Sequence, residues 1–224
     1  MKKISLIIPF LLVILLAAKV YKHFELNQIH QTNQTTVETA RQNPEQSYLE
    51  VPFICQAPLE TEANWVFHEE SCEEAALLQA YNYLTNTETT KQQSHEIILD
   101  MIAWQEENMN SHHDLYADEM KQFITGYYNI PESAVQIIPN ATIEDIEQAI
   151  ASGTPVIAGL SGEILNNPYY PYPGYHMLLI IGYTADKFIT NDNGTRRGKD
   201  FSYDKETFMQ ALKASGGSII ILTL

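Results

Sequence analysis

The sequence predicts an α+β domain, with helices mainly in its first half and an antiparallel sheet mainly in its second half. Helical patterns cover residues 72–84, 94–108 and 117–128, whereas β-rich runs cover residues 154–160, 176–183, 187–190 and 217–224. Strands that follow helices as a group favour an antiparallel sheet, because a parallel sheet needs strands and helices to alternate.

Each element has a local signal. Ser71 or Cys72 begins the first helix, whose apolar side is made of alanine and leucine, and Ser94 is expected to cap the second. Thr142, followed by acidic residues, caps a short helix that stops at Gly153. Residues 134–138 are a further strand, residues 48–55 a short extended segment, and a last helix is expected over about residues 204–214.

Composition and charge exclude several classes of protein. The chain has 224 residues, 45% of them hydrophobic, enough for one large domain with a sizeable core. Two cysteines are too few for a disulfide scaffold or a cysteine zinc ribbon. All 28 acidic residues but only nine of the 13 basic residues follow residue 24, so the net charge beyond it is −19. Such a surface repels phosphate backbones, so nucleic acid is not an expected partner. The chain contains neither of the glycine-rich nucleotide-binding motifs G-x-G-x-x-G and G-x-x-x-x-G-K-[ST], so a nucleotide is not expected either.

Residues 1–24 have the pattern of an export signal or membrane anchor. Two lysines precede an apolar run of 15 residues from Ile4 to Ala18, and Lys19 follows it. Small residues are poorly placed for cleavage, so an uncleaved anchor is favoured over a secreted, cleaved form. Residues 25–47 are rich in Gln, Asn, Thr and Glu, and are expected to be a flexible linker. The domain at 48–224 would then lie outside the cytoplasm, held at the cell membrane.

Three residues form a candidate catalytic set. Cys72 stands at a helix N-terminus, where the helix dipole favours the thiolate. His176 begins one apolar strand and Asp192 follows the next. If these strands form a hairpin centred on Thr184, the two side chains face each other, within the few positions that a bulge can shift. A carboxylate orients the imidazole, which in turn deprotonates the thiol. Each residue alone could equally be an ordinary buried side chain.

Several short motifs carry a family resemblance. They stand in this order: Val51-Pro52-Phe53, Gln56-Ala57-Pro58, Asn64-Trp65, Glu70-Ser71-Cys72-Glu73-Glu74-Ala75, Gly174-Tyr175-His176, Gly182-Tyr183 and Asn191-Asp192. Over residues 48–224 the chain resembles the papain-like cysteine peptidases of the double-glycine (bacteriocin-processing) peptidase-like group, in particular a subset with Cys-Glu-Glu-Ala.

The resemblance implies a papain-like fold and a peptidase that needs no metal or organic cofactor. Cys72 matches the nucleophile, His176 the general base and Asp192 the residue that orients it. Gln56 matches the glutamine of the oxyanion hole, which together with the Cys72 backbone N–H would stabilise the developing charge. A peptide or protein is the expected substrate.

Two other functions remain open. The same residues could transfer the acyl group to an amine instead of water. The chain could also be a catalytically silent peptide-binding module, because Glu73 and Glu74 oppose a neighbouring thiolate. The acidic nucleophile half, with 14 acidic residues and one lysine over residues 60–119, would attract a cationic peptide.

Three further features give weaker expectations. A disulfide between Cys55 and Cys72 would switch the enzyme off, although a buried free thiol is the more common state of a cysteine. His112-His113-Asp114 is expected to be a solvated loop and not a metal site. Tyr169, Tyr170 and Tyr172 could wall the substrate cleft or merely cover the sheet.

Overall fold

A computed structural model describes residue 22 and residues 43–110, 112–170 and 174–224. Residues 43–224 form one compact unit. Apart from residue 22, the predicted anchor lies outside the described residues, as does most of the predicted linker. In the described part of the chain, no helix is both long enough and apolar enough to cross a membrane.

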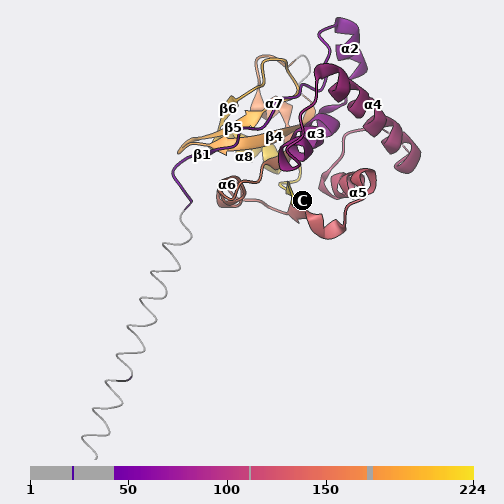
Figure 1. The fold of residues 1–224 in the computed structure, drawn as a ribbon. Helices are drawn as coiled ribbons and strands as arrows, with labels where there is room; N and C mark the ends of the chain where they lie inside the picture. The colour runs from indigo at the N-terminus through magenta and orange to yellow at the C-terminus, as the bar shows by residue number, and fades with distance from the viewer. Residues whose placement is uncertain (1–21, 23–42, 111, 171–173) are drawn as a thin grey trace, which may run out of the picture. The chain divides into compact units, whose positions relative to one another are not determined.

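The centre of the unit is an antiparallel sheet of seven strands (Figure 1). Its order is β2 (Val135–Ile138), β7 (Ile219–Leu222), β3 (Val156–Ser161), β4 (Tyr175–Tyr183), β5 (Lys187–Asn191) and β6 (Phe201–Asp204), and β1 (Ser47–Tyr48) also pairs with β4. Every position of β4 after Tyr175 is buried, so both faces of this strand are covered. This arrangement confirms the predicted α+β class.

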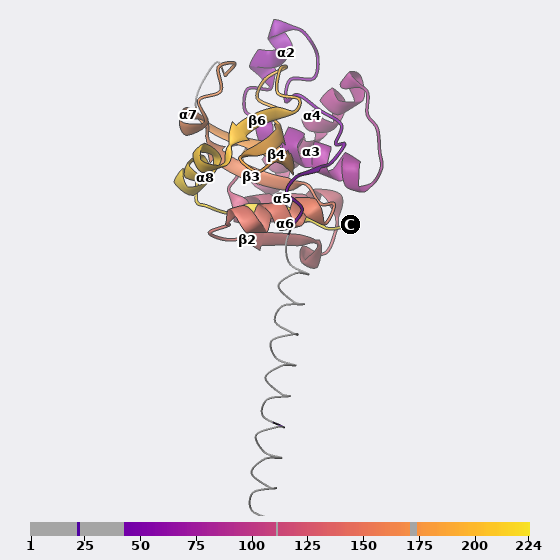
Figure 2. The same cartoon turned by 90° about the vertical axis from the view of Figure 1, so that its left-hand side faces the viewer.

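Helices cover the sheet on two sides (Figure 2). On one side, α3 (Cys72–Leu84) packs against β4 and β3, with α4 (Lys91–Asn108) beside it and α5 (Ala117–Tyr128) next to α4. On the other side, α8 (Lys205–Ala214) packs against β3 and contacts α7 (Gly162–Leu165). A further helix, α6 (Ile143–Ala151), contacts β4 and β1. The predicted helices 72–84 and 117–128 match α3 and α5.

The structure differs from the predicted elements in a few places. Helix α4 begins three residues earlier than predicted, because Thr90 and Gln93 form a capping box and Ser94 lies inside the helix. The short helix α2 (Glu62–Phe67), the turn of 3-10 helix at Glu132–Ala134, α7 and β6 were not predicted. Ser47, expected in the linker, pairs with Tyr183 in the sheet. These elements are all six residues or shorter, where periodicity gives little signal.

Candidate active site

Cys72 is the first residue of α3, as the sequence predicts. Ser71 precedes it but does not cap the helix, because its hydroxyl pairs instead with Nδ1 of His68 at 3.1 Å. In the described part of the chain, the backbone N–H of Cys72 has no hydrogen-bond partner. This free N–H and the helix dipole can both stabilise negative charge beside the sulfur.

His176 and Asp192 lie together, but not by the predicted direct pairing. Strand β4 pairs with β5 through Leu179 and Asn191, and a bulge between Ile180 and Gly182 shifts the register. The shift is two positions from a hairpin centred on Thr184, within the range expected. Nε2 of His176 lies 3.0 Å from Oδ1 of Asp192.

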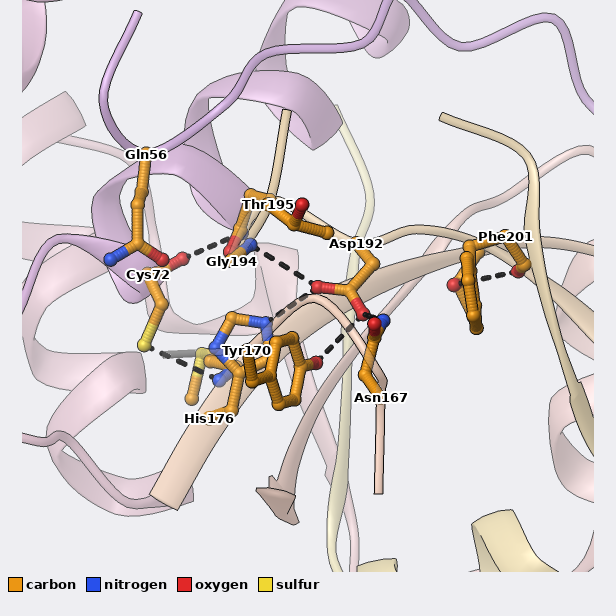
Figure 3. A network of polar contacts seen from close by, with 12 residues as sticks. Gln56, Cys72, Asn167, Tyr170, His176, Asp192, Gly194, Thr195 and Phe201 are labelled. Carbon is orange, nitrogen blue, oxygen red and sulfur yellow. Dashed lines mark hydrogen bonds and ion pairs between the residues drawn. The ribbon is translucent and has the colours of Figure 1, made fainter. Parts of the chain in front are cut away.

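The remaining ring nitrogen of His176, Nδ1, is therefore the one available to a thiol. Figure 3 shows the imidazole between the Cys72 sulfur and the Asp192 carboxylate. Cys72 and His176 line the same cleft, and the backbone N–H of Met177 donates to the Cys72 sulfur at 3.3 Å. The three predicted residues are thus brought to one place.

Asp192 is fully buried and accepts more hydrogen bonds than its role with His176 requires. Its Oδ1 also accepts from the Gly194 N–H at 3.2 Å. Its Oδ2 accepts from Asn167 Nδ2 at 2.9 Å, from the Tyr170 hydroxyl at 2.7 Å and from the Tyr203 hydroxyl. Burial alone would raise the pKa of Asp192, but His176 and the two tyrosine hydroxyls hold it below its usual range.

Three members of this network were not assigned to the site from the sequence: Asn167, Tyr203 and Gly194. Tyr203 is on β6, which was not predicted, so nothing placed it near Asp192. A Cβ at Gly194 would lie 2.7 Å from Cε1 of His176, so this glycine lets the imidazole pack against the backbone. The dipeptide Asn193-Gly194 directly after a candidate catalytic aspartate, a typical turn sequence, was the available signal.

The surroundings of Cys72 combine donors with a carboxyl group. The Cys72 sulfur lies 3.1 Å from Oε2 of Glu73, within hydrogen-bond distance. Burial and the charge of Glu73 raise the pKa of the Cys72 thiol, while the hydrogen bond from Met177 lowers it. An ionised Glu73 would therefore hold Cys72 in the thiol form.

Gln56 lies in the cleft with Cys72, but its amide N–H groups are engaged. Its Nε2 donates to the His68 carbonyl at 2.8 Å and to the Glu69 carbonyl at 2.7 Å. Its Oε1 is buried without a hydrogen-bond partner among the described residues. In this conformation Gln56 fixes the turn that leads into α3, and its amide must release a carbonyl before it can donate to an oxyanion.

The weaker expectations have mixed outcomes. Cys55 and Cys72 are both free, so the hypothesised disulfide is absent from this structure; the Cys55 thiol donates to the Asn193 carbonyl at 3.4 Å. The solvated-loop prediction is wrong for His112, whose Nε2 lies 3.4 Å from Oε1 of the buried Glu74. No group of three or more metal-ligand side chains is found among the described residues.

The tyrosines before His176 separate into two roles. Tyr170 lines the cleft, and its ring meets that of His176 edge-on at 5.0 Å between centroids. Tyr169 packs instead against Phe201 and beneath the guanidinium of Arg197, on the outside of the domain. Tyr172 lies outside the described residues.

The rest of the cleft is acidic and aromatic. It is lined by Gln56, Trp65, Glu69, Glu70, Cys72, Asp114, Tyr170, Gly174, Tyr175, His176 and Gly194. Burial and the neighbouring charges of Asp114 and Glu69 raise the pKa of Glu70. Among the described residues, no lysine or arginine lines this cleft.

This architecture, with a cysteine at a helix N-terminus opposite a histidine on a strand and an aspartate directly after the neighbouring strand, is that of the papain-like cysteine peptidase class. The chain belongs to the Peptidase_C39 like family, which matches residues 48–220. It is similar in fold to a protein from Bacillus anthracis whose crystal structure carries the description C39-like peptidase. The TM-score is 0.56 at 15% identity, over 81% of this chain and 98% of that one. The search of curated proteins gives no match.

Proposed function

We propose that this protein is a membrane-tethered, extracytoplasmic cysteine peptidase that hydrolyses peptide amide bonds. The observation that carries the proposal is the position of His176 beside Cys72 in one cleft, with its Nε2 held by Asp192 at 3.0 Å. Membership of the C39-like family supports a peptidase and therefore a peptide or protein substrate.

In the proposed mechanism, Nδ1 of His176 takes the Cys72 proton and the thiolate attacks the scissile carbonyl. The oxyanion is stabilised by the free backbone N–H of Cys72, and by Gln56 once its amide turns away from one of its two carbonyl partners. The His176 imidazolium then protonates the leaving amine, and the neutral imidazole afterwards takes a proton from the water that attacks the acyl-enzyme, so that the acid product leaves and the Cys72 thiol is restored. Asp192 stabilises the imidazolium throughout this step.

The acidic lining of the cleft favours a cationic peptide. Glu69, Glu70 and Asp114 line the same cleft as Cys72, and opposite charge raises the local concentration of substrate. We expect basic peptides to be cleaved faster than acidic ones of equal length, with the difference shrinking as salt is added. Equal rates at low salt would contradict this preference.

The test is cleavage of a mixed peptide library by the full chain, with new termini detected by mass spectrometry. Cys72→Ala should abolish cleavage, whereas Cys55→Ala, which removes the other thiol, should retain it. Incorporation of ¹⁸O from labelled water into the new carboxyl ends identifies hydrolysis. Transfer of the acyl group to an added amine would favour the acyltransferase alternative. A folded protein that binds peptides without cleaving them would favour the binding module.

The proposed location rests on the pattern of residues 1–24 and is tested separately. A reporter protein fused after residue 224 should be accessible to protease added outside intact cells, and the full chain should stay with the membrane fraction after a high-salt wash. Release of a shortened chain into the medium would favour the secreted, cleaved form.

A further inference from the structure

Two carboxyl groups lie buried directly beside the candidate nucleophile. Glu73 is 1% exposed and Glu74 is 0% exposed, and both follow Cys72 in the first turn of α3. A buried carboxylate without compensation is costly, and two adjacent ones are more so. In a peptidase that needs a thiolate, this pair requires an explanation.

The two groups have different partners. Glu74 accepts a hydrogen bond from Gln105 Nε2, and its Oε1 lies 3.4 Å from Nε2 of His112. Burial alone would lower the pKa of His112, but the neighbouring Glu74 raises it above its usual value, so His112 gains a proton more readily beside Glu74. Glu73 accepts the Leu115 N–H, at 3.0 Å on Oε1, and its Oε2 contacts the Cys72 sulfur.

In the described part of the chain, neither carboxyl forms an ion pair with lysine or arginine. The titratable groups around Glu73 come from two elements and a loop. Helix α3 contributes Cys72 and Glu74, the loop before α5 contributes His112 and Asp114, and β4 contributes Tyr175 and His176. Of the two carboxyls, Glu74 is the one that lies beside a histidine able to carry a positive charge, through its Oε1; its Oε2 has no hydrogen-bond partner among the described residues. Burial and Glu74 together raise the pKa of Glu73 well above its usual range.

We propose that Glu73 is a neutral carboxylic acid whose O–H donates to the Cys72 sulfur, and that it thereby stabilises the reactive thiolate. The proposal rests on the proposed function, since it concerns the same nucleophile. The 3.1 Å contact fits this proton position as well as the reverse one, in which a thiol donates to a carboxylate. With Glu73 neutral, the thiolate has two donors, this O–H and the Met177 N–H.

The protons balance without an external acceptor. The Cys72 proton moves to Nδ1 of His176, while Glu73 keeps its own proton and directs it at the sulfur. When the acyl-enzyme forms, the sulfur becomes neutral and the Glu73 hydrogen bond weakens. When the thiolate is released again, the hydrogen bond is restored. Glu73 would thus stabilise the charged form of the nucleophile, in the way a protonated acid can stabilise an anion in an apolar site.

The test is the rate of Cys72 alkylation by iodoacetamide in the full chain, followed by mass spectrometry under reducing conditions from about pH 5 to about pH 9. In Glu73→Gln the Leu115 N–H keeps the amide oxygen in place, so the amide N–H points to the sulfur. We expect this variant to react within about threefold of the natural protein at acidic pH. Glu73→Ala loses the donor and should react about 10- to 100-fold more slowly.

At alkaline pH the two donors should behave differently. Above the pH at which Glu73 ionises, its charge opposes the thiolate, whereas glutamine cannot ionise, so in that range the rate for Glu73→Gln should exceed that of the natural protein. Glu70→Gln is the matched control, because it removes a carboxyl from the same cleft without a hydrogen bond to the sulfur. It should not reproduce this divergence with pH.

Other results would overturn the proposal. If Glu73→Gln reacts at least tenfold faster already at acidic pH, Glu73 is ionised and suppresses the thiolate. If Glu73→Ala does not fold, the pH profile of Glu73→Gln still decides. An infrared difference spectrum between the natural protein and Glu73→Gln should show the C=O stretch of a protonated carboxyl. A difference spectrum that contains carboxylate bands and no such C=O stretch would contradict the proposal.

The Glu73 proposal can fail independently of the proposed function. His176→Ala should remove the activation of Cys72 if the proposed mechanism holds. Activation that depends on His176 but not on Glu73 would overturn this inference alone. Ordinary thiol reactivity in the natural protein, unaffected by His176→Ala, would overturn the proposed function as well.

Discussion

The hydrogen-bond network of Asp192 makes Asp192→Asn a large perturbation despite its small change in shape. Five donors converge on this carboxylate, and each hydrogen bond to a charged acceptor contributes about 1.5–3 kcal/mol, against about 0.5–1.5 for a neutral one. On Oδ1, the bonds from His176 and Gly194 should weaken by about 1 kcal/mol each. The substitution places an NH2 group where Oδ2 accepts hydrogen bonds. The tyrosine hydroxyls can rotate and accept a hydrogen bond from it, but the Asn167 NH2 then faces another donor and loses its partner, which costs about 1–3 kcal/mol.

The free energy of unfolding should therefore fall by about 3–5 kcal/mol, a large part of the 5–15 kcal/mol typical of a domain. Urea unfolding of the full chain measures it as a lower midpoint at unchanged slope. Asp200→Asn is the control, since Asp200 accepts one exposed hydrogen bond, from Tyr48 at 2.8 Å, and should cost less than about 1 kcal/mol. A loss from Asp192→Asn no larger than that of the control would refute the claim that the network stabilises a buried carboxylate.

Three further predictions concern pH, packing and the second thiol. Because the pKa of Asp192 is lower in the folded than in the unfolded protein, its contribution to the free energy of unfolding is present above the unfolded pKa near 3.9 and is lost as pH falls through the folded pKa. The difference in urea midpoint between the natural protein and Asp192→Asn should therefore shrink from about pH 5 to about pH 2. A constant difference would contradict this. Gly194→Ala should displace the His176 ring, whose Nε2 would lie 3.0 Å from the new Cβ, and slow Cys72 alkylation about tenfold or more, whereas Gly174→Ala has open space and should not. Burial raises the pKa of Cys55 to about 11, so iodoacetamide should leave this thiol largely unmodified at pH 8, as peptide mapping would show.

Long amphipathic segments and catalytic residue types could be predicted from the sequence, whereas short segments and their contacts could not. Helices α3 and α5 lie where predicted: α5 carries a clear apolar periodicity over its 12 residues, whereas α3 is 13 residues of strong helix formers that are buried on nearly every side. The pairing of His176 with Asp192 was predicted within two positions. The error arises at the turn, because Tyr183 pairs with Phe188 and the hairpin is centred between Ala185 and Asp186; the bulge between Ile180 and Gly182 then shifts the register back by one position.

The role of Gln56 shows what this limit means for mechanism. Its position in the cleft follows from the family motif, but the state of its amide depends on the turn after α2, a six-residue helix that the sequence did not predict. That turn brings the carbonyls of His68 and Glu69 to its Nε2. Exchanging one of these neutral hydrogen bonds for an oxyanion gives up about 0.5–1.5 kcal/mol and gains a charged one of about 1.5–3 kcal/mol. Gln56 is thus expected to turn toward the substrate only when negative charge develops, so that this donor would favour the transition state over the bound peptide.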